Sequence, residues 1–159
     1  MGWLGTLFAR LSGEAPPVPP RDHPVLGRIQ PSHRPREGAW LWETLTPLEH
    51  ARGRVSVTWL ADSSGPSEPQ VAFWGWLAAH IDEVVEQAWP LLSIDVRDWT
   101  EQPAPGEPWQ ELIWEGAGLP ADGDRLSEWD VSFATRTCPD VMLTVSFIEG
   151  KPVFVTADD

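Results

Sequence analysis

Residues 67–89, SEPQVAFWGWLAAHIDEVVEQAW, decide the fold that we expect for this chain. Ser67 followed by Gln70 forms a capping box, and Pro69 suits the first turn of a helix. Beyond these residues, apolar side chains recur every three to four positions and charged side chains take the other face, which is typical of an amphipathic helix. Pro90 should end or kink this helix, because proline lacks the N–H that a helix interior needs.

Stretches on both sides of this helix alternate apolar and polar residues, as half-buried strands do. They are VLGRIQ at 25–30, GAWLWETL at 38–45, RVSVTWL at 54–60, LSEWDVSFAT at 126–135, VMLTVSF at 141–147 and PVFVT at 152–156. Gly150 can supply the positive φ of a tight turn, so the last two stretches should form a hairpin. The sequence predicts an α+β fold, with an antiparallel sheet of about five or six strands and one long helix packed on one face.

The first twelve residues predict a short amphipathic helix ahead of this domain. Its apolar stripe consists of Trp3, Leu4, Leu7, Phe8 and Leu11. So short a helix is unstable alone in water and must dock on the domain, on a partner or on a membrane surface. Prolines in the segment that follows favour an extended linker. We therefore expect a helix at 1–12, a linker at 13–22 and a single α+β domain at 23–159.

The chain of 159 residues carries 11 Lys and Arg against 24 Asp and Glu, a formal net charge of -13. Binding to nucleic acid requires clustered basic side chains, and Lys151 is the only lysine. The single cysteine, Cys138, excludes an internal disulfide. The start of the chain lacks the pattern of a secretory signal, and no apolar stretch is long enough to span a bilayer. We expect a cytoplasmic protein.

The acidity is regional and is densest from Asp95 to Asp130, where ten acids face only Arg97 and Arg125. This segment is either a solvated surface or a negative face for a basic partner. Most of the eleven tryptophans should pack in the core, but those in the acidic, proline-rich stretch at 95–118 follow no clear period. We predict a partner-binding surface that consists of Asp98, Trp99, Glu101, Trp109, Glu111, Trp114 and Glu115.

Motifs of the common enzyme classes are absent from the sequence. His80 and Glu83 have a spacing that could form an acid–base couple or hold a metal ion, although a solvated pair on a helix is the more common arrangement. Cys138 could act as a nucleophile only beside a histidine, and its TRTCPD context indicates a loop. We therefore expect a protein that is not an enzyme and that has neither cofactor nor metal.

The stretches at 40–62, 67–87 and 127–159 together resemble a family of small, uncharacterised bacterial α+β domains. In this family a meander leads into a helix, and the chain closes with a Trp-Asp strand and a hairpin. Family members often carry Glu-His-Gly before the final hairpin, whereas this chain has Thr-Cys-Pro-Asp at 137–140, so no role of that histidine is carried over. The resemblance implies a fold and a link to immunity or accessory proteins of toxin systems.

These observations favour a protein-binding module, most concretely an acidic immunity-type inhibitor of a basic bacterial toxin. An alternative is an adaptor that the first eleven residues tether to a membrane or a larger assembly. A third hypothesis is an enzyme that uses His80, Glu83 or Cys138.

Overall fold

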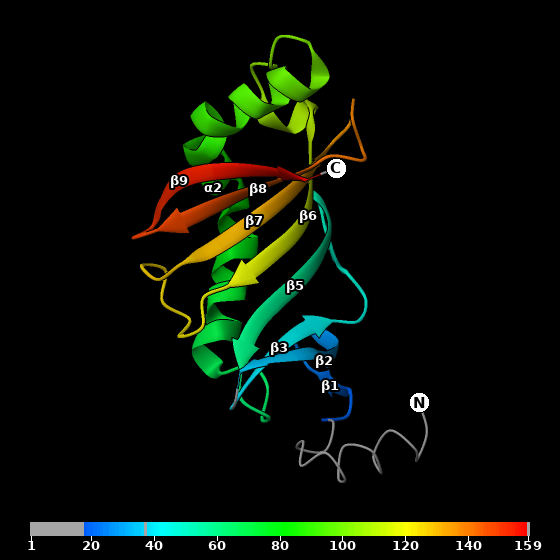
Figure 1. Ribbon diagram of the computed structural model, residues 1–159, viewed down its shortest axis with the longest axis vertical. Helices are drawn as coiled ribbons and strands as arrows, with labels where there is room; N and C mark the ends of the chain where they lie inside the picture. The colour runs from blue at the N-terminus through cyan, green and yellow to red at the C-terminus, as the bar shows by residue number, and fades with distance from the viewer. Residues whose placement is uncertain (1–17, 37, 159) are drawn as a thin grey trace.

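A computed structural model of the protein describes residues 18–36 and 38–158 (Figure 1). Its elements are β1 (Arg21–His23), β2 (Gly27–Arg36), β3 (Ala39–Thr44), β4 (Leu48–His50), β5 (Gly53–Ala61), α2 (Glu68–Thr100), the 3-10 turn η1 (Pro108–Gln110), β6 (Leu112–Leu119), β7 (Trp129–Thr135), β8 (Met142–Ile148) and β9 (Lys151–Asp158). The predicted N-terminal helix and residues 13–17 of the predicted linker lie outside the described residues. Strand β1 begins within the range predicted as linker.

The described strands form one nine-stranded sheet in the order β1-β2-β3-β5-β6-β7-β8-β9, with β4 paired beside β3 on the same edge of β5. All pairs are antiparallel except β5 and β6, which run parallel and are joined through α2. The fold is therefore α+β with one long helix, as predicted. The expected count of five or six strands and the expectation of a purely antiparallel sheet are wrong.

The structure adds three strands that alternation did not indicate. β1 and β4 have three residues each, too few to show a period. β6 lies in the stretch that reads as an acidic loop, because a bulge between Trp114 and Gly116 interrupts its alternation. Alternation therefore does not predict β6, which lies at the centre of the sheet.

Helix α2 begins as predicted and ends later. The Ser67 side chain accepts from the backbone N–H of Gln70, and the Gln70 side chain accepts from the backbone N–H of Ser67, so the capping box is complete. The helix continues through Pro90 to Thr100 because Leu92 and Val96 extend its buried stripe. The ribbon of α2 changes direction along its length (Figure 1), as expected where proline removes a helical hydrogen bond.

Buried side chains of α2 and of the sheet face that it covers form one core. Trp42, Trp59, Trp74 and Trp129 are buried in it, and Trp40 and Trp89 pack partly buried against it. The expectation that most tryptophans pack in the core is confirmed for these six. The predicted C-terminal hairpin is also confirmed, with Glu149 and Gly150 both at positive φ in its turn.

A row of small and polar residues crosses the face of the sheet opposite α2. Facing positions across the central strands are Glu43, Thr58, Gly118, Asp130 and Ser146. Figure 1 shows no described helix over this face, an arrangement that suits antiparallel sheets with one solvated side.

Candidate functional site

Three of the seven predicted partner-binding residues gather at the C-terminal end of α2. Asp98, Trp99 and Glu101 are all exposed there, and Trp99 exposes 39% of its surface. Ile94 lies five residues earlier, about 1.4 turns of the helix, and exposes 47% of its surface. Figure 1 shows this end of the helix extending beyond the sheet. Two large apolar side chains thus lie among acids on a projecting element. We call Ile94, Asp95, Asp98, Trp99 and Glu101 the acidic end.

One carboxylate of the acidic end, that of Asp95, is disfavoured in its charged form in the isolated molecule. Burial, with the nearby charge of Asp98, raises the pKa of Asp95 above its ordinary value. Asp98 pairs with Arg97 at 3.0 Å, but both side chains are largely exposed, so this pair adds little stability. The negative end of the helix dipole lies beside the same carboxylates, whereas a cation would be stabilised at this position.

Glu111 connects two loops near the acidic end. Its carboxylate accepts hydrogen bonds from the backbone N–H of Thr137 at 2.8 Å and from the Thr137 hydroxyl at 3.0 Å. The thiol of Cys138 in the same turn donates to the carbonyl oxygen of Trp99 at 3.4 Å. Glu111 therefore holds the turn that contacts the end of α2, a positioning role that the sequence did not indicate.

Trp114 belongs to the core and not to a surface. Its exposed fraction is 0%, and its indole N–H donates to the carbonyl of Gly116 at 2.8 Å. The expectation that Trp114 anchors a partner is wrong. It was based on the irregular spacing of apolar residues around Trp114, and the bulge in β6 causes that irregularity. Glu115, the extra residue of that bulge, is half-buried.

Trp109 is partly covered from within the molecule. The guanidinium of Arg52 lies 4.8 Å from its ring centroid, and Phe133 packs against its edge. Arg52 also makes a bidentate ion pair with Asp82 at 2.8 and 2.9 Å, and these hydrogen bonds lower the pKa of Asp82. Trp109 is therefore half-buried and packs beside the ion pair that joins α2 to the turn before β5.

The residues singled out for chemistry are in ordinary structural contacts. Nδ1 of His80 lies 2.8 Å from the carbonyl oxygen of Trp76, and its ring stacks on the Trp76 indole. No hydrogen bond joins His80 to Glu83 in the part of the chain that the structure describes. Within residues 18–36 and 38–158, no group of three or more His, Cys, Asp or Glu side chains is arranged to hold a metal ion.

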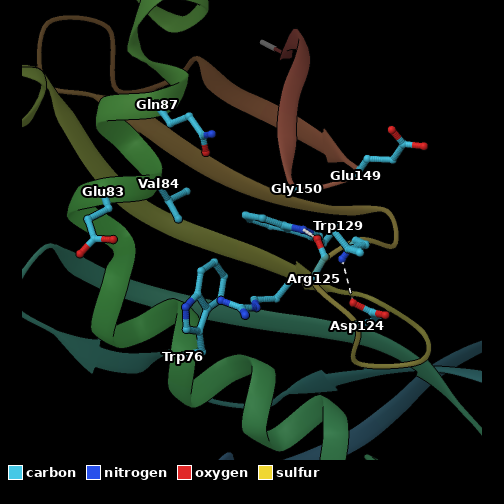
Figure 2. A pocket seen from close by; sticks show the side chains of 10 residues that line it. Trp76, Glu83, Val84, Gln87, Asp124, Arg125, Trp129, Glu149 and Gly150 are labelled. Carbon is cyan, nitrogen blue, oxygen red and sulfur yellow. Dashed lines mark hydrogen bonds between the residues drawn. The ribbon is translucent and has the colours of Figure 1, made fainter.

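Two hollows lie away from the acidic end. One, of about 430 Å³, is on the open face where β5 and β6 end and includes Asp130. Burial, together with the charge of Glu128, raises the pKa of Asp130. The other, of about 500 Å³, lies between α2, the loop at 124–126 and the turn at Glu149 and Gly150 (Figure 2). No sequence motif indicated either hollow, because each joins segments far apart in the chain.

Comparison with protein-family models, with curated proteins and with solved structures finds no match for this chain. Among the described helices, none has the length and apolar character that crossing a membrane requires.

Proposed function

We propose that this protein is a non-enzymatic binding module that holds a basic protein through the acidic end of α2. The observation that carries the proposal is the exposure of Trp99 and Ile94 among Asp95, Asp98 and Glu101. Interface hot spots are commonly such aromatic side chains within a ring of polar ones.

The physical argument has two parts. Carboxylates at a projecting helix end attract a positively charged partner and speed its encounter, and a cation placed there also relieves the helix dipole. Once the partner has docked, burial of the two apolar side chains removes their surface from water and slows dissociation. Both contributions fit a partner with basic residues around an apolar hollow.

Within this class, an immunity-type inhibitor of a basic bacterial toxin is the form that we propose. The regional acidity supports this form, which the resemblance noted from the sequence implies. An inhibitor of this kind needs only a surface that covers the active site of its target, and we assign that role to the acidic end.

A photo-crosslinking residue at position 99 tests the proposal in the native host. We expect one stoichiometric adduct with a basic protein, and none from a matched probe at Val25, which is also exposed but lies in the turn between β1 and β2. Affinity for that partner, measured by calorimetry, should fall at least about tenfold in D98K/E101K. The weakening should be smaller at high salt.

The matched control is E83K/E86K, which makes the same charge change at the same spacing on the exposed side of the same helix. It should bind the partner within about twofold of the unmodified protein. Equal losses in the two variants would mean that only the net charge matters, and the acidic end would then not be the binding site.

A further inference from the structure

The hollow between α2 and the hairpin turn has the size and walls of a small-molecule site. Its volume of about 500 Å³ falls in the range typical of ligand pockets. Val84 and Trp129, both buried, and the indole of Trp76 form apolar walls. Figure 2 shows these side chains around an open space between the helix and the loop.

Arg125 supplies a fixed positive charge at this space. Its guanidinium lies 4.8 Å from the ring centroid of Trp76, and Trp76 is itself held by stacking on His80. The backbone is fixed as well, because the indole N–H of Trp129 donates to the Arg125 carbonyl at 3.1 Å. Across the described ranges, no hydrogen bond or ion pair engages the Arg125 guanidinium, so its donors are available to a ligand.

Gln87 adds a second polar group. In Figure 2 its amide points from α2 into the same space, and its side chain makes no hydrogen bond to any residue that the structure describes. The carboxylates of Glu83 and Glu149 lie at the rim and point away from the space (Figure 2). The donors of Arg125 and Gln87 therefore face the space. Asp124, the third carboxylate of the lining, accepts a hydrogen bond from the backbone N–H of Leu126. This arrangement admits one compact negative group and disfavours an anion of higher charge.

We propose that this pocket binds a monocarboxylic acid with an apolar or aromatic body. A guanidinium pairs with a carboxylate through two parallel hydrogen bonds, a strong and directional contact. The Gln87 amide would donate to the same carboxylate, and the apolar body would lie against Trp129 and Val84. A free acid and the C-terminal residue of a peptide share this chemistry. The site is separate from the acidic end and does not depend on the proposed function.

The test is titration of the ¹⁵N-labelled protein with phenylacetate, followed through the indole N–H resonances. We expect those of Trp76 and Trp129 to shift and those of Trp42 and Trp59 to stay. Phenylacetamide, which has the same shape without the charge, should bind at least about tenfold more weakly. N-acetylphenylalanine distinguishes a peptide C-terminus from a free acid as the natural ligand. Tighter binding than phenylacetate indicates a peptide C-terminus, and weaker binding indicates a free acid.

R125Q should weaken phenylacetate binding at least about tenfold. R54Q removes the same charge from an exposed arginine on β5 that pairs with Glu49 and should change it less than about twofold. Unshifted indole resonances elsewhere establish that R125Q folds. Four results would each overturn the proposal. Phenylacetamide could bind as tightly as phenylacetate, or R125Q could bind phenylacetate unchanged. The protein could prefer benzylamine, or phenylacetate could cause no shift up to its solubility limit.

Discussion

Trp42 of β3 and Trp59 of β5 are paired across the two strands and differ in the hydrogen bonding of the indole N–H. Both are fully buried in the same core, with exposed fractions of 0% and 1%. The indole N–H of Trp42 donates to the carbonyl of Asp62 at 2.9 Å. The indole nitrogen of Trp59, in contrast, is buried and has no hydrogen-bond partner among the described residues. A buried donor without a partner lowers stability.

This difference predicts unequal results from the same substitution. W42F and W59F each remove the same atoms, but W42F also leaves the Asp62 carbonyl without its donor, whereas W59F removes an unsatisfied donor. We expect W42F to lower the free energy of unfolding by about 1 kcal/mol or more beyond W59F. Urea denaturation of the two variants measures the difference. Equal losses would show that packing volume alone governs both positions.

The first turn of α2 shows how one element is joined to two others. Gln70 completes the capping box, and its amide nitrogen also lies within hydrogen-bond distance of the carbonyl oxygens of Leu60 at 2.9 Å, Pro120 at 3.2 Å and Ala121 at 3.1 Å. The Leu60 carbonyl lies near the end of β5, and the other two carbonyls directly follow β6, its parallel partner. A local helix start is therefore also the point at which the helix is held to both strands.

Truncation of this side chain should cost more than loss of the cap alone. We expect S67A to lower the free energy of unfolding by about 1 kcal/mol. Q70A should lower it by roughly 2–3 kcal/mol, since three carbonyls, that of Pro120 buried and those of Leu60 and Ala121 partly buried, lose their shared donor. The urea denaturation midpoints of the two variants measure the difference, provided that the dependence of the free energy of unfolding on urea concentration is the same in both. If Q70A matched S67A, the tertiary bonds of Gln70 would contribute nothing measurable.

Charge is the property that acts over the whole molecule. The net charge is -13. Each of the four ion pairs among the described residues joins one base to one acid and so leaves this excess of negative charge unchanged, and all four are at least partly exposed. Like charges at such density repel one another and oppose the compact state. Salt screens this repulsion, because the Debye length falls from about 30 Å at 0.01 M to about 8 Å at 0.15 M.

Stability should consequently rise with salt. We expect the urea midpoint to increase between about 0.01 M and 0.15 M NaCl. E83K/E86K changes the net charge by +4, from -13 to -9, and should show a smaller increase. A midpoint that is flat or falls with salt in the unmodified protein would mean that local ion pairs outweigh the overall repulsion.

Features that depend on near neighbours were predictable. The capping box at Ser67 and Gln70, the alternation in β5, β7 and β8, and the turn at Gly150 each involve residues a few positions apart, so the sequence determined where α2 starts and which strands flank it. Composition likewise determined the acidity. Asp98, Trp99 and Glu101 are exposed, and their part in binding stays a prediction.

Features that depend on distant segments were decided only by the tertiary structure. Helix α2 passes Pro90 because packing of Leu92 and Val96 outweighs one lost hydrogen bond. Trp114 is buried because β6 pairs between β5 and β7, which no local period reveals. Arg125 reaches Trp76 only when the loop after β6 folds back on the helix. Each outcome follows from burial and pairing between remote residues, whose free energy is absent from any short stretch of sequence.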